Sequence, residues 1–462
     1  MRLINQLYLH GVLPLFERKT GVGLARRMEQ FKGWEWLSAD EVRTRQWDAL
    51  VRLLQHAYNT SAFYRKRFDG ANFNPKQPFD PADLHRIPFV TREDMRLNLN
   101  EMYSRDYSLD QLSVSATGGT TDTPVKFYRD TNSVRQKVAL QWQLSGWAGM
   151  YPGDKVFYLW GARSDYAADP SWRWSVYDKR LMRRRWAPTS VMTAEVAEQY
   201  RRELNQFRPR IIYAYPTPLA MLCEFIQQSG KPLHSPVSAI CTAESLLDAQ
   251  REVIERTLGC PVFALYGARE FGMIGAECAE HAGIHFAEPG AYVEFIPVPN
   301  AEQQGLCEIV VTDLLNYGMP LIRYRVNDCA VLGHEICRCG RGYRLVSAVT
   351  GRTGDIFQLP DGSKVPGVAL TNRVLQVCPD VRKIQIVQNT IEEFTVRFVP
   401  LDSAANHGMA VLRENLRKFF PPEVRWTFEQ VADIEREPSG KTRFCISKLP
   451  QGRQGELSST RT

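Results

Sequence analysis

The chain has 462 residues, of which 44% are hydrophobic and 24% charged, and a formal net charge of +7. This composition is that of a folded globular protein and excludes a disordered or membrane-embedded class, while the length allows one large domain and a small one. No apolar run is long enough to span a bilayer, and Asn5, His10 and Pro14 interrupt the N-terminal leucines. We therefore expect a cytoplasmic protein without a transmembrane segment, whose ten cysteines stay reduced.

The first predicted element is a helix within residues 40–70, where leucines recur at spacings of three and four. Its core-facing residues are Leu50, Leu53, Leu54 and Ala57. From about residue 80, short apolar runs alternate with helical stretches, which is the rhythm of a mostly parallel sheet with helices on its faces. The predicted strands lie within 154–161, 208–216, 235–245 and 260–270, and the predicted helices span 217–230 and 246–259.

Beyond residue 290 the apolar runs become shorter and predict a smaller β-rich layer, with strands at 291–298, 306–314 and 319–326. After residue 355, strands at 383–388 and 393–399 and a helix at 409–420 predict a small α+β unit. The predicted fold class is α/β. Its predicted parts are a large domain at 1–350, a hinge at 351–355, a small C-terminal domain at 356–449 and a flexible tail at 450–462.

Polar side chains follow the predicted parallel strands at the point where each strand ends. In open α/β sheets, ligands bind beyond the carboxyl ends of the strands, so we expect the functional site there. The residues at these positions are Tyr215, Ala243, Glu244, Tyr266, Gly267 and Glu270.

A loop rich in glycine and threonine, SATGGTTDTPVKFYRD, spans residues 115–130 between two predicted strands. Small residues let backbone amides and hydroxyl groups approach phosphate oxygens, so this loop is a candidate nucleotide cradle. It lacks the Gly-Lys-Ser/Thr ending of a Walker A loop, and its composition alone is equally compatible with an ordinary turn.

The sequence of this loop resembles the Thr/Ser-Gly-Thr-Thr-Gly-x-Pro loop of the adenylate-forming superfamily. The matching residues are Thr117, Gly119, Thr120, Thr121 and Pro124. Five more segments resemble motifs of that superfamily, in its order, over more than three hundred residues. They are AESL at 243–246, YGAREFG at 266–272, RYRVNDCA at 323–330, GRTGDIF at 351–357 and REPSGKTRF at 436–444. The chain is similar above all to the phenylacetate-CoA ligase-like family and its capsule-biosynthesis-like branch.

This resemblance implies an ATP-dependent enzyme that converts a carboxylic acid into an acyl-adenylate and transfers the acyl group to CoA. Lys441 would supply the mobile cation that the charged transition state needs, and Glu270 would hold Mg²⁺ at the phosphates. Asp328 would accept hydrogen bonds from the ribose, and Arg352 would approach the ribose or phosphate from the hinge. The resemblance further assigns nucleotide contacts to Thr117, Gly119, Thr120, Thr121, Ala243, Glu244, Tyr266 and Gly267.

Three positions depart from the superfamily pattern. Asp122 replaces the second glycine of the phosphate loop and brings a negative charge close to the phosphates. Asn327 replaces the glycine before the ribose aspartate. Gly354 occupies the position of a first hinge aspartate and leaves Asp355 as the hinge residue. These departures indicate altered specificity or lost activity.

A separate group of cysteines and histidines lies in ECAEHAGIH at 277–285 and CRCG at 337–340. Thiolates and imidazoles in a reduced compartment suit tetrahedral Zn²⁺, although buried free thiols are the alternative. Relatives with the resemblance described above carry such a cluster, which favours a structural zinc ion, with His281 as the reserve ligand. The predicted ligands are Cys278, His285, Cys337 and Cys339.

The sequence does not identify the carboxylic acid substrate. Trp142, Trp147, Tyr213 and Tyr215 would suit an aryl or apolar acid, but aromatic residues at these spacings are more often part of the core. Absence of GxSxG and GxGxxG motifs leaves hydrolase and dehydrogenase functions unsupported. Nucleic acid is not expected as a partner, and a homodimer stays open.

Three alternatives remain beside the CoA ligase. In the first, the enzyme passes the acyl group to an amine or hydroxyl in surface-polysaccharide biosynthesis. In the second, the chain is a degenerate, zinc-stabilised binding protein. In the third, an anionic partner or membrane binds the basic cluster Arg183–Arg185, which otherwise is a solvated face.

Overall fold

The computed structural model of the protein describes residues 3–14, 21, 23–116, 125–160, 182–189, 193–299, 305–333, 337–352, 356–361, 364–366, 381–400, 406–435 and 445–449. None of the helices in this described part combines the length and apolar character that a membrane crossing requires. The N-terminal third is helical, with short 3₁₀ and π segments between the α-helices. Its helical elements are α1 (Leu3–Leu7), η1 (Tyr8–Val12), α3 (Leu24–Glu35), α4 (Ala39–Thr60), α5 (Ala62–Gly70), η2 (Pro81–Arg86), α6 (Arg92–Met102) and η3 (Leu109–Gln111).

The helix predicted within residues 40–70 is confirmed as α4 and α5, which are separated at Ser61. A capping box begins α4, because the Ser38 hydroxyl accepts from Glu41 N at 3.3 Å and the Glu41 carboxylate accepts from Ser38 N at 2.9 Å. All four predicted core residues of α4 are buried, with at most 1% of each exposed. The stripe therefore packs inward, as its spacing indicates.

A single sheet of eleven strands forms the body of the protein, in the order β10-β11-β12-β13-β9-β8-β7-β6-β5-β3-β4. Strands β7, β6, β5, β3 and β4 are mutually parallel, and the other pairs are antiparallel. The parallel strands are β3 (Val156–Trp160), β4 (Arg184–Pro188), β5 (Ile211–Ala214), β6 (Ser238–Thr242) and β7 (Val262–Ala268). The predicted βαβ arrangement is confirmed by these strands and their helices.

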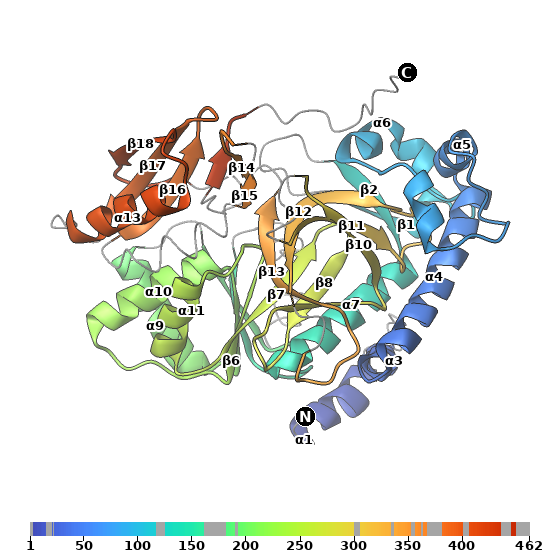
Figure 1. Ribbon diagram of the computed structural model, residues 1–462. Coiled ribbons are helices and arrows are strands. Elements are labelled where there is room, and N and C mark those ends of the chain that lie inside the picture. The colour runs from blue at the N-terminus through green and yellow to red at the C-terminus, as the bar shows by residue number, and fades with distance from the viewer. Residues whose placement is uncertain are drawn as a thin grey trace.

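Helices cover both faces of the parallel part (Figure 1). Val156 and Tyr158 pack in one apolar cluster with α7 (Thr131–Ser145), followed by η4 (Gly146–Ala148). Phe157 and Leu159 pack in another cluster with α9 (Ala194–Phe207), α10 (Pro216–Ser229) and α11 (Asp248–Leu258). Alternate side chains of one strand thus reach two cores, which explains why these strands read as continuous apolar runs.

The β-rich segment beyond residue 270 continues the same sheet instead of forming a separate layer. Its strands are β8 (Gly272–Glu277), β9 (Ile284–Phe286), β10 (Ala291–Pro297), β11 (Leu306–Asp313), β12 (Tyr324–Leu332) and β13 (Leu345–Arg352). A separate two-stranded sheet pairs β1 (Leu112–Ala116) with β2 (Lys126–Asp130).

The strand predicted at 319–326 is wrong over its first five residues, because β12 begins at Tyr324. Arg323 has a positive φ of 50° and a buried guanidinium that donates to Glu294 and to the Leu84 carbonyl. The apolar run before it lies in a core cluster that also contains residues of the N-terminal helices, and the Tyr64 hydroxyl of α5 donates to the Pro320 carbonyl at 2.9 Å and accepts from Ile322 N at 3.1 Å.

Strand β14 pairs with β15 in a two-stranded sheet, and the other C-terminal strands form a four-stranded sheet in the order β18-β17-β16-β19. Phe394, Leu412 and Leu416 are buried in its core beside Phe357. The elements are β14 (Ile356–Gln358), β15 (Lys364–Pro366), β16 (Val381–Gln388), β17 (Glu393–Pro400), α13 (Asn406–Phe419), β18 (Arg425–Gln430) and β19 (Cys445–Ser447). The predicted fold class, α/β with a small α+β C-terminal part, is therefore confirmed.

Candidate functional site

The candidate nucleotide site lies where the parallel strands end and β12 approaches them. Tyr266 belongs to β7, and Asp328 belongs to β12, which is four places away in the sheet order. The Tyr266 hydroxyl nevertheless donates to Asp328 Oδ2 at 2.9 Å. Curvature of the sheet therefore brings together two residues that are 62 positions apart and that the sequence assigns to one nucleotide.

A second tyrosine–carboxylate contact lies beside the first. Glu270 follows β7, and its Oε1 accepts from the hydroxyl group of Tyr324, the first residue of β12, at 3.2 Å. Burial, reinforced by the charge of Asp328, raises the pKa of Tyr266 well above its usual value. Burial also raises the pKa of Tyr324, with Glu270 adding to the effect. Both phenols therefore stay protonated at neutral pH and act as donors that orient the two carboxylates.

Glu244 comes after β6 and lies at the beginning of α10. Its Oε2 accepts from Thr217 N, in the first turn of that helix, at 3.2 Å. A carboxylate at this position is stabilised by the positive end of the helix dipole. The preceding residue, Ala243, has a positive φ of 71°, which is rare for alanine and turns the chain sharply after the strand. The Ala-Glu element is thus held in a fixed, strained conformation.

Gly267 has a steric role in the hairpin between β7 and β8. A Cβ atom at Gly267 would lie 2.5 Å from the carbonyl oxygen of Gly272 and 3.1 Å from the Met273 sulfur. The register of the two strands shifts at this point, between Tyr266 and Gly267. Glycine is therefore required for the close approach of the two strands that carry Tyr266 and lead to Glu270.

The departure at Asn327 keeps the backbone conformation that a glycine would adopt. Asn327 has a φ of 62°, in the left-handed region that asparagine tolerates better than most residues. Its replacement of glycine therefore leaves the path of β12 before Asp328 intact. In the strand register, Asp328 pairs with Arg352 at the end of β13, so these two predicted residues are neighbours in the backbone.

Several predicted residues lie outside the described residues, and the structure does not test them. They are Thr117, Gly119, Thr120, Thr121, Asp122 and Pro124 of the glycine-threonine loop, Gly354 and Asp355 of the hinge, and Lys441.

Sequence reasoning missed Tyr324, which orients Glu270. The available signal was its position in RYRVNDCA, four residues before Asp328 on the same strand. Alternation along a strand places such residues on one face.

The four predicted metal ligands converge in the structure. One ligand atom from each of Cys278, His285, Cys337 and Cys339 lies within 4.8 Å of all the others. The sulfur atoms of Cys278 and Cys337 are 3.6 Å apart, and Cys339 Sγ is 3.4 Å from His285 Nε2. Sulfur ligands around a tetrahedral zinc ion lie about 3.8 Å apart, given Zn–S bonds of about 2.3 Å. The donor set therefore fits zinc in both chemistry and spacing.

His285 is held in the form that binds metal. Its Nδ1 lies 3.2 Å from the carbonyl oxygen of Tyr343, and since a carbonyl only accepts, Nδ1 must carry the proton. Nε2 then presents its lone pair to the cluster, as second-shell contacts of zinc-bound histidines require. Burial lowers the pKa of His285, which keeps the ring neutral. His281 lies outside this group and contacts Glu277 at 3.3 Å.

The loop that carries Cys337 and Cys339 is tied to the N-terminal helix α3. Buried Glu35 accepts from Trp147 Nε1 at 2.7 Å and from Arg341 Nε at 3.3 Å, and its carbonyl accepts from Gly342 N at 3.0 Å. The Trp147 ring also meets His285 edge-on, with centroids 5.8 Å apart. Trp147 therefore lies against the metal cluster, not against the nucleotide residues.

The remaining aromatic and basic residues mostly have internal partners. Trp142 and Tyr213 are buried in the core on the α7 face of the sheet. Of the basic cluster, Arg183 donates to the Gly153 carbonyl at 2.8 Å, and the guanidinium groups of Arg184 and Arg185 lie near the rings of Tyr158 and Phe207. These three arginines are half-buried.

The chain is similar to known proteins over most of its length. Residues 357–448 match the family described as the CapK C-terminal domain. The chain is 25% identical to protein CapK of Staphylococcus aureus over 396 residues, which cover 84% of this chain and 85% of CapK. It is 26% identical to the phenylacetate-coenzyme A ligase of Thermus thermophilus over 336 residues, 70% of this chain and 73% of that protein.

Among solved structures, 2-hydroxyisobutyryl-CoA ligase in the postadenylation state, in complex with R3-HIB-AMP, has a TM-score of 0.71 at 19% identity. The match covers 89% of this chain and 91% of the ligase. The same ligase in complex with 2-HIB-AMP and CoA, in the thioesterification state, gives a TM-score of 0.58. The fold of this chain is therefore that of the adenylate-forming CoA ligases.

Proposed function

We propose that this chain, a relative of CapK and of the phenylacetate-CoA ligases with the adenylate-forming fold, activates a carboxylic acid as an acyl-adenylate and transfers the acyl group to CoA. In the first step a carboxylate oxygen attacks the α-phosphorus of ATP, and the bond to pyrophosphate breaks. In the second step the CoA sulfur attacks the acyl carbon, and AMP leaves. The observation that carries the proposal is the pair of contacts Tyr266–Asp328 and Tyr324–Glu270 at one edge of the sheet.

Each residue of this edge receives a role that matches its chemistry. Asp328, oriented by Tyr266, accepts from the ribose hydroxyls, and Arg352 approaches from the neighbouring strand. Ala243 and Glu244 contact the adenine. Glu270, oriented by Tyr324, holds Mg²⁺ at the phosphates, because hard cations prefer carboxylate oxygens. The backbone and hydroxyl groups of Thr117, Gly119, Thr120 and Thr121 bind the phosphates.

The C-terminal segment is proposed to act as a mobile lid. Its Lys441 enters the site for adenylation, where negative charge accumulates, and leaves it for thioester formation. The proposed boundaries remain a large domain at 1–350, a hinge at 351–355 and a lid at 356–449.

A structural zinc ion is proposed at Cys278, His285, Cys337 and Cys339. The four donors fit its preferred ligand types and spacing, and when bound the ion would cross-link the β8–β9 hairpin to the 337–343 loop. With four protein ligands, a bound zinc ion would have a structural role.

Replacing Asp328 with alanine is expected to weaken ATP binding by roughly 100-fold, because two charge-assisted hydrogen bonds contribute about 3 kcal/mol together. Tyr266→Phe removes only the orienting hydroxyl group and should weaken ATP binding less, by up to about tenfold. Isothermal titration of Mg·ATP into each variant measures this difference. Equal affinities in the wild type and Asp328→Ala would contradict the assignment of Asp328.

The proposed activity is tested by pyrophosphate release from Mg·ATP over a panel of aryl and fatty acids, with and without CoA. Release that requires an acid supports adenylation, and consumption of CoA identifies the acceptor. A folded, metal-loaded protein that binds no ATP and releases no pyrophosphate with any acid would contradict the proposal and favour a binding protein.

A second candidate keeps adenylation and changes the acceptor to an amine or hydroxyl group. The relation to CapK over 84% of the chain, together with the CapK-type C-terminal segment, favours considering it. Adenylation that proceeds with an acid but forms no thioester when CoA is added, and forms an ester or amide with added sugar acceptors, would select this alternative.

A further inference from the structure

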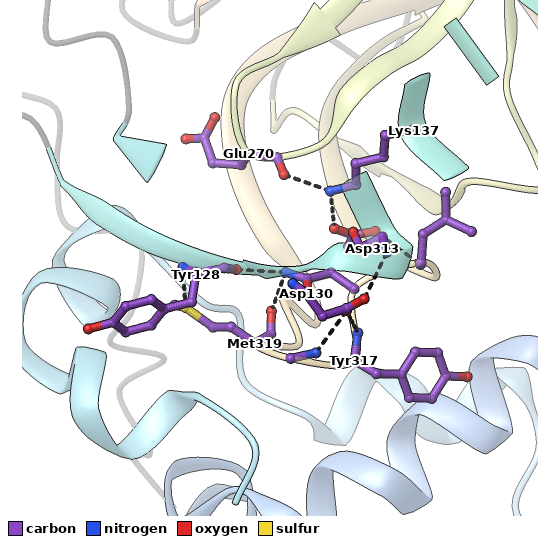
Figure 2. A network of polar contacts seen from close by, with 11 residues as sticks. Tyr128, Asp130, Lys137, Glu270, Asp313, Tyr317 and Met319 are labelled. Carbon is purple, nitrogen blue, oxygen red and sulfur yellow. Dashed lines mark hydrogen bonds and ion pairs between the residues drawn. The ribbon is translucent and has the colours of Figure 1, made fainter. Parts of the chain in front are cut away.

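A buried lysine lies directly beneath the segment that carries Glu270. Lys137 belongs to α7, and only 9% of its side chain is exposed. Its ammonium group donates to Asp313 Oδ2 at 2.6 Å and to the backbone carbonyl of Glu270 at 2.9 Å (Figure 2). Asp313 is the last residue of β11, and its side chain is 1% exposed. The lysine therefore connects α7, β11 and the Glu270 segment through one nitrogen atom.

The stem of Lys137 also fixes the chain after Glu270. Gly272 has a φ of 77°, and a Cβ atom at this glycine would lie 3.6 Å from Lys137 Cβ and 3.8 Å from its Cγ and Cδ. In Figure 2 the Glu270 carboxylate points away from the lysine, while the backbone carbonyl points toward it. Lys137 thus holds the main chain of Glu270, and Tyr324 holds its carboxylate.

The two elements that hold Lys137, α7 and β11, are themselves linked to each other. Asp130 ends β2 and begins α7, where its Oδ1 accepts from Ser133 N at 2.7 Å. Its Oδ2 accepts from the amides of Tyr317 and Gly318 at 3.0 and 3.1 Å, in the segment that follows Asp313 (Figure 2). A charged acceptor with three backbone donors is a strong anchor. The beginning of α7 and the end of β11 therefore cannot shift independently.

Stability alone does not account for this ion pair. Removing two charges from water costs several kcal/mol per ion, and a well-packed apolar pair often serves stability as well or better. Such a pair does fix a geometry, because the ammonium group has two acceptors at set distances. We infer that Lys137 is a positioning residue, which holds the Glu270 backbone so that the carboxylate meets Mg²⁺; this inference rests on the proposed function.

The first test separates positioning from stability with the double variant Lys137→Met/Asp313→Leu, which removes both charges and leaves neither one buried alone. We expect folding stability to fall by only about 1–3 kcal/mol, because the Leu315 amide loses its Asp313 acceptor at 3.0 Å. The Mg²⁺ concentration for half-maximal acid-dependent pyrophosphate release is expected to rise at least tenfold, with the rate at saturating Mg²⁺ changed less than threefold. Wild-type Mg²⁺ dependence in the stable double variant would overturn the inference.

A matched control is Arg210→Met. Arg210 pairs with fully buried Asp154 at 3.5 Å, next to the amino ends of β5 and β3 and thus at the opposite edge of the sheet. This variant is expected to lose stability without any change in Mg²⁺ dependence. A similar Mg²⁺ shift in Arg210→Met would mean that general destabilisation causes the effect, and would also overturn the inference.

A second readout does not depend on catalysis. The amide of Phe271 donates to the Ala268 carbonyl at 3.1 Å and so reports on the Glu270 turn. Hydrogen exchange of a peptide spanning residues 266–273 should be at least tenfold faster in the double variant than in the wild type and Arg210→Met. Unchanged exchange refutes positioning by Lys137 even if the wild type is an active ligase. Faster exchange in a protein without any adenylation leaves the positioning intact and refutes the proposed function.

Discussion

Lys441→Ala is expected to lower acid-dependent pyrophosphate release by roughly 10²–10³-fold, the usual effect of removing one donor to developing charge. Attack of a carboxylate on the α-phosphorus of ATP brings two anions together, and negative charge accumulates on the phosphate oxygens. A single ammonium group in the glycine-containing loop at 436–444 would neutralise it. ATP affinity, measured by titration calorimetry, should change less than about threefold, because most of the proposed nucleotide contacts lie within residues 1–350.

Two comparisons distinguish a catalytic role of Lys441 from a general effect of the basic segment around it. Arg443→Ala removes a cation two residues away in the same loop and should retain most of the activity. When preformed acyl-adenylate and CoA are supplied, Lys441→Ala should form thioester at nearly the wild-type rate, because the proposed lid movement would withdraw the lysine in that step. Equal losses in both half-reactions, or in both variants, would contradict the role given to Lys441.

Cys337→Ser is expected to abolish stoichiometric zinc binding and to lower the free energy of unfolding by at least about 3 kcal/mol, because a lost ligand leaves buried thiol and imidazole groups without their common partner. Metal content per chain, measured by mass spectrometry, and the urea midpoint report the two effects. The 337–343 loop also holds α3 through Glu35, so destabilisation should extend to the N-terminal helices.

Cys223→Ser is the matched control for the metal site. Cys223 belongs to α10, and its fully buried thiol lies in the core outside the cluster. This variant should keep one zinc ion per chain and lose only the cost of a buried hydroxyl, about 1–3 kcal/mol. A wild-type protein that binds no zinc after reconstitution, or a Cys337→Ser variant that still binds it, would contradict the proposed centre.

Local patterns predicted the parallel strands and their helices because each strand is buried on both faces by consecutive elements. The apolar runs around Ile211 and Ala239 mark such strands directly. The run at 319–323 reads the same way, yet its burial comes from helices more than 200 positions earlier, as with the Arg323 contacts to Leu84. No periodicity within the run carries that information.

The residues of the candidate site also differ in whether the local sequence could predict them. Tyr266, Glu270 and Asp328 were predicted from ordered motifs, and hydroxyl–carboxylate contacts join Tyr266 to Asp328 and Tyr324 to Glu270. Lys137 carries no motif, since its role depends on the approach of α7 to β11 and to the Glu270 carbonyl. A lysine in a helix reads as a solvated residue until tertiary packing buries it.

The most direct measurement of the central claim follows an oxygen atom. An acid labelled with ¹⁸O in its carboxylate is incubated with Mg·ATP, CoA and the protein, and the nucleotide product is analysed by mass spectrometry. Attack on the α-phosphorus, followed by transfer of the acyl group, leaves one acid oxygen on AMP. We predict AMP that carries one ¹⁸O atom, together with unlabelled pyrophosphate. ADP accompanied by labelled inorganic phosphate would instead indicate an acyl-phosphate route and would contradict the account.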